Sequence, residues 1–459
     1  MPPDASNPLR GDPAIERFLA LLRIATVSRN DAALVDADAF ARFREELSAS
    51  YPVVHSKLEH ETVRSDDGAL SLLYRWPGRG TGRPAVLMAH HDVVPADEPG
   101  WVHPPFESAI VPGEGGATGE ERIWGRGTLD DKGALVAILE AVEARLTAGY
   151  VPAADVYLFS GANEETAGSG AELAVALLTE RGVRPGLVLD EGGAVAEGAF
   201  PGVQGPVAFV GVSEKGIAGI ELSVERPGGH AATPARDGAT TRLACAIVRL
   251  ETHPSRAVLT EPMAAMLRVL APRARGIQRR FFARPRAFRL PLLSALTRRG
   301  GEGEAMVRTT RAVTRLTGSA GDNVIAERAT AIVNVRIAVG STVDEAAADI
   351  RHAIGDDQVA VRVMYGAEPS PASPSEGPEW ERLAGVIADV FPDAIVAPYV
   401  MLQASDSRHF SRISDTVYRF LPFDLTTAER GTLHAIDESI RVSTWRRAIA
   451  FYDGLLEAL

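Results

Sequence analysis

The chain has 459 residues, of which 46% are hydrophobic and 24% charged, and its formal net charge is −12 at pH 7. This length favours two domains over one hydrophobic core, and the acidic balance argues against a nucleic-acid partner. The sequence contains no apolar run long enough to cross a bilayer, and the start, MPPDASNPLRGDP, does not resemble a secretory signal. We therefore expect a cytoplasmic protein with no nucleic-acid and no membrane partner.

From Pro84 to about Gly211, short apolar runs alternate with amphipathic helical stretches, which is typical of a mostly parallel sheet covered by helices. We expect strands in AVLMAHHD, ADVYLFSGANEE and LVLDEGG, and helices in DKGALVAILEAVEARLTAG and SGAELAVALLTERG. Acidic and histidine residues come at the C-terminal end of each strand, where ligands gather in open α/β sheets. The predicted fold class is therefore α/β, with a functional site along this edge.

From about Val212 the predicted order changes to strand, helix, strand, strand, helix and strand, which is a ferredoxin-like βαββαβ unit. The Pro/Ser linker GAEPSPASPSEGP follows, and the closing helix TWRRAIAFYDGLLEAL resumes the first pattern. We predict a catalytic domain of residues 1–211 and 367–459, interrupted by a lid domain of residues 212–366. A lid helix carries the only cysteine, Cys245, which we expect to be a buried structural thiol.

A long insertion, near residues 255 to 305, splits the predicted lid. It contains the stretch RARGIQRRFFARPRAFRLP, in which aromatic residues alternate with cations. This pattern is compatible with binding to nucleic acid or to a membrane surface. The acidic charge of the whole chain favours a solvated lid surface or a subunit contact instead.

The strand AVLMAHHD and the loop GRGTLDDKG supply the first polar clusters. His90 and Asp92 point to the same side because side chains alternate along a strand, so Asp92 can orient the ring of His90. His91 points the other way and is interpreted as a packing neighbour. Asp130 and Asp131 stand at the N-terminus of a helix, where a pair of capping residues is the alternative interpretation.

Three more clusters follow along the chain. GANEETAGSG offers Glu164 and Glu165, which an extended backbone directs apart, one to a metal and one to a water; a solvated acidic loop is the alternative. LDEGG supplies Asp190 after an apolar strand, where a carboxylate needs a partner, and HAID supplies His434. Two histidines and three carboxylates can hold two zinc ions roughly 3.5 to 4 Å apart if one carboxylate bridges them.

Seven motifs in order resemble the dinuclear-zinc metallopeptidase family that includes carboxypeptidase S, carboxypeptidase G, aminoacylase and acetylornithine deacetylase. They are AHHDVVPAD, WGRGTLDDKG, ANEETAGSG, LDEGG, PGGHAATP, GDNVIAERATAIVNVRI and HAIDES. The resemblance runs from about residue 15 to the C-terminus. The carboxypeptidase S branch is the most similar, because GWVHPPFESAI, GVSEKG and VRTTRAVTRLTG also resemble it.

The resemblance implies a metal centre with two divalent ions. His90 and Asp190 would hold one ion, Glu165 and His434 would hold the other, and Asp130 would bridge them. A cis peptide bond would follow the bridging aspartate. Zinc is the expected metal, although carboxylate and imidazole ligands also accept cobalt or manganese.

The resemblance also implies roles for residues around the metals. Glu164 would be the general base, and Asp92 would support His90. His230 on the lid would stabilise the oxyanion, in many family members at the active site of the partner subunit, with a turn histidine as the alternative. Asn323 and Arg408 would receive the carboxylate of the substrate, and a purely structural role is the alternative for both.

The predicted function is hydrolysis of an amide bond next to a free carboxylate, by a carboxypeptidase or N-acyl-amino-acid amidohydrolase. The substrate would be a small peptide or an N-acyl amino acid. A dipeptidase of the same family, or a metal-binding relative without catalysis, are the alternatives. We expect a homodimer in which an exposed edge strand of the lid, IELSVERP, pairs with its copy. Two positions depart from the family pattern: alanines follow His230 where serines are common, and Ala326 stands where proline is frequent. The substrate pocket and the lid contacts can therefore differ from those of the family.

Overall fold

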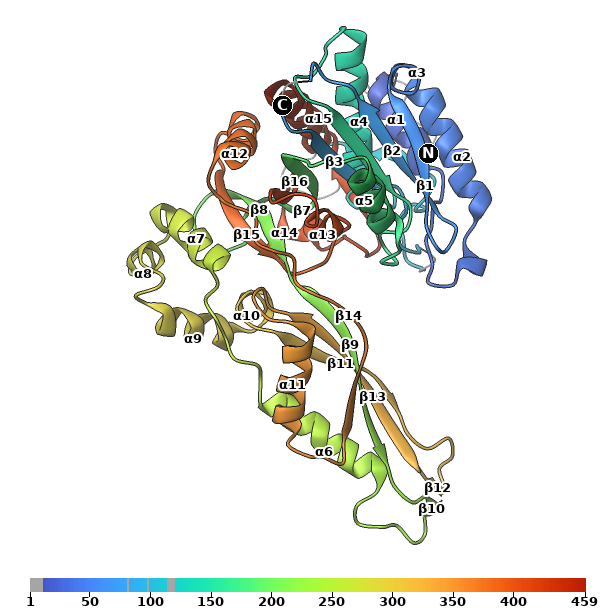
Figure 1. The fold of residues 1–459 in the computed structure, drawn as a ribbon, viewed down its shortest axis with the longest axis vertical. Coiled ribbons are helices and arrows are strands. Elements are labelled where there is room, and N and C mark those ends of the chain that lie inside the picture. Colours follow the sequence, from blue (N-terminus) through green and yellow to red (C-terminus); the bar gives the residue numbers. More distant parts are fainter. Residues whose placement is uncertain (1–10, 81, 97–98, 114–119) are drawn as a thin grey trace.

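The computed structural model describes residues 11–80, 82–96, 99–113 and 120–459. Figure 1 shows a larger body, which holds both ends of the described chain, and a narrow second body that extends away from it. In the described part of the chain, none of the helices is long and apolar enough to cross a membrane.

The larger body is built on an eight-stranded sheet. Its strands, in spatial order, are β1 (Glu59–Arg64), β2 (Leu70–Trp76), β6 (Val156–Gly161), β3 (Ala85–His90), β7 (Leu187–Glu197), β16 (Val417–Leu425), β8 (Pro206–Glu214) and β15 (Ile395–Met401). β3 runs parallel to both β6 and β7, β16 runs parallel to β7, and β15 runs parallel to β8. The predicted mostly parallel α/β sheet is therefore confirmed.

Helices cover both faces of this sheet because its central strands are apolar on both sides. Leu87 and Ala89 of β3 belong to a core shared with α1 (Pro13–Leu22), α2 (Ala37–Ser50), α3 (Pro52–Lys57), α4 (Lys132–Thr147) and α15 (Val442–Ala458). Val86 and Met88 belong to the opposite core, shared with α5 (Gly170–Glu180) and α13 (Ser407–Phe410). The two cores hold β3 rigidly, and His90 is its last residue.

Four further groups of residues complete this body. They are η1 (Ala32–Leu34), α12 (Pro378–Val390), α14 (Thr427–Arg430) and a small sheet of β17 (Ser439–Arg441), β5 (Arg122–Trp124) and β4 (Ala109–Val111). The small sheet joins the segment before α4 to the segment after α14.

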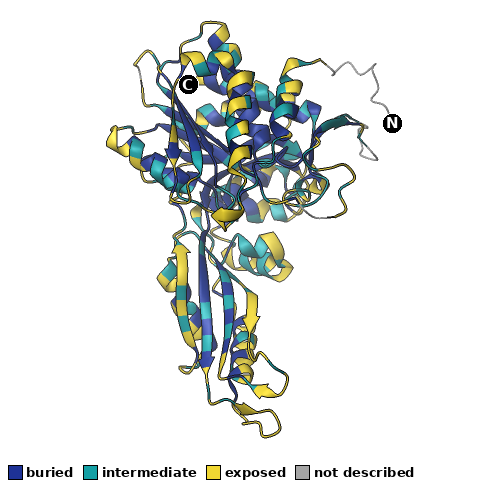
Figure 2. Cartoon of the chain, turned by 90° about the vertical axis from the view of Figure 1, so that its right-hand side faces the viewer, coloured by how far each residue is buried: buried dark blue, intermediate teal, exposed yellow. Residues whose placement is uncertain are grey.

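The second body is the predicted βαββαβ unit. It contains β9 (Gly216–Glu225), α6 (Ala239–Thr252), β11 (Thr310–Thr317), β13 (Arg328–Ile337), α11 (Val343–Ile354) and β14 (Ala360–Ala367), with strand order β11, β13, β9, β14. The short strands β10 (Gly229–His230) and β12 (Val324–Ile325) pair at its far end (Figure 1). Figure 2 shows the buried residues of this unit along its central strands. We call it the lid.

Two expectations about the lid are wrong. The strand that contains IELSVERP is β9, which lies between β13 and β14, so the edge strands of the lid are β11 and β14. Cys245 is exposed. The buried face of α6 carries Leu243, Ala246 and Leu250, and Cys245 falls outside it because a helix turns by about 100° per residue.

The insertion forms α7 (Glu261–Leu270), η2 (Ala271–Arg273), α8 (Gln278–Ala283), α9 (Arg289–Arg299) and α10 (Gly301–Ala305). Met263 and Leu267 share a core with Phe209 of β8 and Ala397 of β15. The insertion therefore widens the larger body beside β15.

Candidate metal centre

The predicted ligands come from separate segments that meet at one edge of the large sheet. His90 ends β3, Glu164 and Glu165 follow β6, and Asp190 lies within β7. Asp130 precedes α4, and His434 follows α14. Because β3, β6 and β7 are parallel, their carboxyl ends meet at one edge, where ligands bind in α/β sheets.

Asp130 lies between the two histidines. Its Oδ1 is 2.8 Å from Nε2 of His90, and its Oδ2 is 2.9 Å from Nε2 of His434. Nε2 of His434 is also 3.2 Å from Oε2 of Glu165. A carboxylate with one oxygen toward each imidazole has the arrangement that a bridging ligand needs. The peptide bond from Asp130 to Asp131 is cis, as the family resemblance predicts.

Asp92 connects the first histidine to the acidic loop. Nδ1 of His90 is 2.8 Å from the backbone oxygen of Asp92 and 3.4 Å from its Oδ1. The Asp92 carboxylate accepts hydrogen bonds from the backbone nitrogens of Glu164 and Glu165, at 3.1 and 3.2 Å. Asp92 is fully buried, so these contacts set the orientation of the ring and of the loop together.

The LDEGG motif presents a different carboxylate from the one that the resemblance implies. Oδ2 of Asp190 accepts a hydrogen bond from the backbone nitrogen of Ser407, at 2.9 Å. Oε1 of the next residue, Glu191, is 3.8 Å from Nε2 of His90. Carboxylate oxygens of Glu191 and Glu164 group with a nitrogen of His90 closely enough to hold an ion. The metal role of Asp190 stays a prediction, and Glu191 is a residue that the sequence interpretation missed.

The centre concentrates negative charge in a buried place. Burial raises the pKa of Glu164 well above its usual value, and the charges of Asp406 and Glu165 add to this rise although His90 opposes it. Hydrogen bonds to Asp130 and Glu165 raise the pKa of His434 to about 10. Carboxylates that repel one another in a low-dielectric site favour a bound cation.

The side chains present fit divalent metal ions. Two groups could each hold an ion, namely His90, Asp130 and Glu165, and His90, Glu164 and Glu191. Oε1 of Glu165 is buried and has no hydrogen-bond partner among the described residues. A buried acceptor without a donor is costly unless a cation satisfies it. The mixture of imidazole and carboxylate ligands suits zinc, cobalt or manganese.

A buried ion pair holds the two ligand-bearing loops together. Nη1 of Arg126, before Asp130, is 2.5 Å from Oε2 of Glu438, after His434. Oε1 of Glu438 also accepts hydrogen bonds from the backbone nitrogens of Gly127 and Leu129, at 3.0 and 2.8 Å. Glu438 lies in the HAIDES motif, which is the only sequence signal for this positioning role.

The predicted lid residues lie apart from this cluster. His230 is in β10 and Asn323 immediately precedes β12, at the end of the lid that is far from the large sheet (Figure 1). Both residues are exposed. Arg408, in α13, is half-buried, and its charge lowers the pKa of the buried carboxyls Glu214 and Asp406, against the larger effect of burial. A single chain in this arrangement does not bring His230 to the metal ligands.

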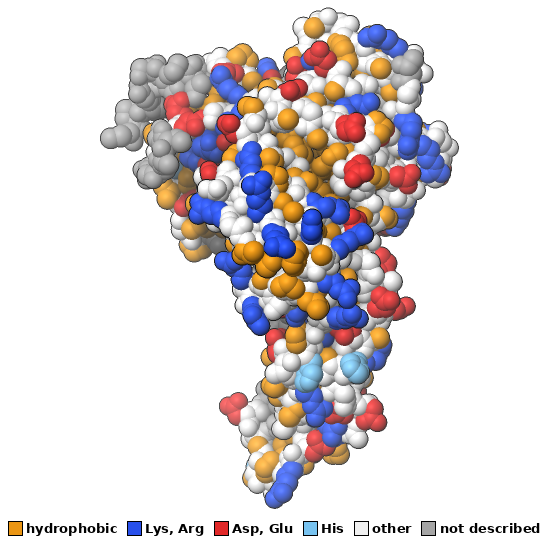
Figure 3. All heavy atoms as spheres, turned by 90° about the vertical axis from the view of Figure 1, so that its left-hand side faces the viewer, with side chains coloured by type: hydrophobic (Ala, Val, Ile, Leu, Met, Phe, Trp, Pro, Cys, Tyr) orange, Lys and Arg blue, Asp and Glu red, His pale blue; other side chains and the backbone are white. Residues whose placement is uncertain are grey.

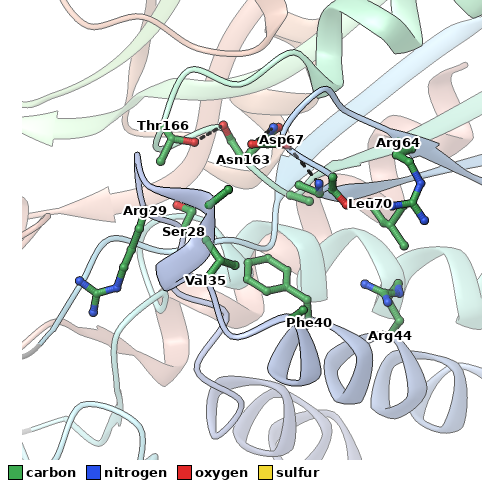
Figure 4. Close-up of a pocket in the computed structure, with 15 residues that line it drawn as sticks. Ser28, Arg29, Val35, Phe40, Arg44, Arg64, Asp67, Leu70, Asn163 and Thr166 are labelled. Atoms are coloured by element: carbon green, nitrogen blue, oxygen red, sulfur yellow. Dashed lines mark hydrogen bonds between the residues drawn. The ribbon is translucent and has the colours of Figure 1, made fainter.

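A cavity of about 250 Å³ lies behind the loop that carries Glu164 and Glu165, and Asn163 and Thr166 belong to its lining (Figure 4). Nδ2 of Asn163 donates a hydrogen bond to Oδ2 of Asp67, at 2.9 Å, and Oγ1 of Thr166 donates one to the backbone oxygen of Asn163, at 3.2 Å. The first bond ties Asn163, just before Glu164, to the turn between β1 and β2, and the second closes the loop across Glu164 and Glu165.

An edge of a parallel sheet that gathers two imidazoles and several carboxylates, fits divalent ions and opens to a cavity defines a metal-dependent hydrolase. A family model described as Peptidase family M20/M25/M40 matches residues 86–458. The chain therefore belongs to the M20 peptidase family, whose members include metallopeptidases and amidohydrolases.

Two relatives and one solved structure show the extent of the similarity. The chain is 32% identical over 426 residues to the Probable carboxypeptidase S-like 2 of Dictyostelium discoideum, covering 91% of this chain and 79% of that protein. It is 32% identical over 425 residues to the N-fatty-acyl-amino acid synthase/hydrolase PM20D1 of Homo sapiens, covering 91% and 82%. The fold matches an M20 family metallo-carboxypeptidase, Sso-CP2 from Sulfolobus solfataricus, with a TM-score of 0.68, 16% identity and coverage of 97% and 98%.

Proposed function

We propose that the chain hydrolyses the amide bond between an apolar acyl group and an amino acid whose carboxylate is free. The observation that carries this proposal is the cavity of about 460 Å³ at the metal centre. Its polar end is formed by Asp130, Glu164, Glu165, Glu191 and His434. Apolar side chains line much of the remainder, namely Ala194, Ala196, Ala199, Phe200, Phe209, Met306, Tyr399, Met401, Leu421 and Leu433.

The composition of this cavity favours an acyl chain or an apolar side chain over a charged group. A dipeptidase would have to bind a substrate with a free amine. That amine would lose its hydration against the apolar wall. The described charged residues of the wall outside the metal centre are Glu302 and Arg430, whose side chains pair with each other at 3.0 Å. The relatives named above, a carboxypeptidase S-like protein and an N-fatty-acyl-amino acid hydrolase, are compatible with this substrate class.

Different residues of the centre have different chemical roles. Two divalent ions, for which zinc is our proposal, would polarise the amide carbonyl and lower the pKa of water when bound. His90, Asp130, Glu165 and His434 would hold them, together with Asp190 or Glu191. Glu164 takes the proton from the attacking water and returns it to the leaving amine. Its presence speaks against a relative without catalysis.

The lid would complete the site from a second copy of the chain. His230 and Asn323 are exposed at the far end of the lid, so they cannot act on the metal centre of their own chain in this arrangement. We propose a homodimer in which the lid of one subunit brings His230 to the substrate of the other. Arg408, close to the centre, would bind the substrate carboxylate by a charge-assisted hydrogen bond.

Three substrates with the same leucine test the proposal. We expect the enzyme loaded with zinc to hydrolyse N-octanoyl-leucine, to cleave leucyl-leucine poorly, and to show a strongly raised KM for N-octanoyl-leucinamide. Preference for the dipeptide would indicate a dipeptidase instead. Equal activity on the acid and its amide would indicate a general amidase without recognition of the carboxylate.

A further inference from the structure

The insertion carries a surface that differs in charge from the rest of the chain. Residues 262 to 300 include ten arginines and no acidic residue, in a chain of net charge −12. We call the exposed part of α8, α9 and their adjoining turns the arginine face. Its exposed arginines are Arg275, Arg279, Arg280, Arg284, Arg286, Arg289, Arg298 and Arg299.

Most of this positive charge is not neutralised by the chain itself. Arg286 forms an ion pair with Glu261. Within the described ranges, the other exposed arginines of this face form no ion pair. Like charges crowded on one surface repel one another, and an anionic partner that approaches this surface removes the repulsion.

Two large aliphatic side chains project from the same face. Ile277, before α8, is 63% exposed, and Leu290, in α9, is 71% exposed. Figure 3 shows apolar side chains surrounded by Lys and Arg on the side of the molecule that carries the insertion. Cations around protruding apolar groups are typical of surfaces that lie in the headgroup region of a bilayer.

We propose that the arginine face docks on membranes that contain anionic phospholipids. The arginines pair with the phosphate and carboxylate groups of the lipids, while Ile277 and Leu290 enter the apolar boundary beneath them. This partner differs from our expectation of a protein without membrane contact. No spanning helix is needed, because an interfacial surface binds from one side.

Two other partners fit this face less well. Single-stranded nucleic acid stacks its bases on exposed aromatic faces, but Phe281 and Phe288 are half-buried and pack on each other, with 4.8 Å between ring centroids. A second copy related by a two-fold axis would bring two arginine faces together, and these would repel.

The insertion also contributes to the cavity beside the metal centre. The segment that follows α9 contributes Glu302 and Met306 to the wall of the cavity described above. The lipid-facing surface and one wall of the cavity therefore belong to a single segment of the chain. The docking proposal goes beyond the proposed hydrolysis, because it depends only on the charge and exposure of this segment.

Sedimentation with sucrose-loaded vesicles tests the proposal on the full chain. The vesicles are pure phosphatidylcholine, or an equimolar mixture of phosphatidylcholine and phosphatidylglycerol. Variant one replaces Arg279, Arg280, Arg284 and Arg289 by glutamine, and variant two combines Ile277→Ser with Leu290→Ser. The control removes the same charge from the lid, by replacing Arg236, Arg315, Arg328 and Arg351 by glutamine.

We expect the wild-type chain to bind the mixed vesicles, to leave pure phosphatidylcholine unbound, and to dissociate as salt is added. Variant one should lose about a thousandfold in partitioning, variant two should also bind more weakly, and the lid control should bind like wild type. Equal losses in variant one and the lid control would overturn the proposal. Binding to duplex DNA or heparin without binding to mixed vesicles would also overturn it, as would self-association that variant one abolishes.

Discussion

The carboxylate of Asp92 accepts a hydrogen bond from the backbone nitrogen of Glu164, with 3.1 Å between the nitrogen and Oδ1. The other carboxylate oxygen accepts from Glu165 in the same way, and Asp92 also contacts the ring of His90. One buried carboxylate thus fixes His90, a predicted metal ligand, and Glu164, the predicted base, relative to each other.

We therefore expect Asp92→Asn to weaken both metal binding and turnover. The asparagine amide would turn its NH₂ group toward one of the two backbone N–H donors. An NH₂ group cannot accept a hydrogen bond, so that donor would lose its acceptor. Loss of such a supporting carboxylate costs about 10- to 100-fold in metal affinity. Metal titration with a competing chelator measures this, and Asp66→Asn, at an exposed aspartate, is the control. Unchanged affinity in Asp92→Asn would show that its contacts are dispensable.

The adjacent glutamates Glu164 and Glu165 are predicted to have different functions. Glu164→Gln should keep metal near the wild-type level and lower kcat by at least about a hundredfold, because the amide cannot accept the proton from water. Glu165→Gln should deplete metal, because a neutral amide is a poor ligand. Elemental analysis and kinetics on the same samples decide the matter. Equal metal content in both variants would contradict separate roles.

The pair Asp190 and Glu191 offers a direct comparison of two neighbouring carboxylates. Glu191 lines the cavity and lies 3.8 Å from the ring nitrogen of His90, whereas Asp190 accepts a hydrogen bond from Ser407. From this geometry we expect Glu191→Gln to lower metal affinity at unchanged thermal stability of the metal-free protein. Asp190→Asn should lower that stability. If only Asp190→Asn loses metal, the assignment implied by the family resemblance is correct.

A pH dependence of stability is expected from Glu429. Burial raises the pKa of this carboxyl, but hydrogen bonds from the Thr426 backbone, Arg122 and Arg441 outweigh burial and lower the pKa from 4.5 to about 2. A pKa below that of the unfolded chain stabilises the fold above about pH 4.5, by up to roughly 3 kcal/mol. This stabilisation is lost as the pH falls from there toward about 2.

Urea unfolding of wild type and Glu429→Gln at several pH values tests this dependence. We expect the difference in free energy of unfolding to be largest at neutral pH and to shrink below about pH 4.5. Glu376→Gln, at an exposed glutamate, should show no such trend. A difference that stays constant with pH would show that the loss comes from packing rather than charge.

The shared-site dimer predicts complementation between two inactive variants. His230→Ala removes the lid histidine, and Glu164→Gln removes the base of the large body. A mixed dimer regains one intact site, so mixing the variants should restore up to about a quarter of the wild-type activity if subunits exchange at random. Each variant alone is the control. Failure to recover activity after demonstrated subunit exchange, or a fully active monomer, would exclude the shared site.

The sequence by itself determined the architecture and the main chemical groups of the centre. The alternation of apolar runs with helical periodicity predicted the mostly parallel sheet, and the change of order after Val212 predicted the βαββαβ lid. Both follow from local patterns, because side-chain periodicity depends on backbone geometry alone. The placement of His90 and Glu165 near each other followed from parallel strands that end at a common edge, whereas Asp130 and His434 reach the centre from the segments before α4 and after α14.

Only the tertiary structure decided which neighbour of a pair faces the centre and which strand of the lid is central. Asp190 and Glu191 are adjacent in sequence, and the packing of Ser407 against Asp190 leaves Glu191 to face His90. The place of β9 between β13 and β14 depends on long-range pairing that no local pattern encodes. The docking of the insertion on β15 likewise depends on a core shared by segments far apart in the chain, such as Met263 and Ala397.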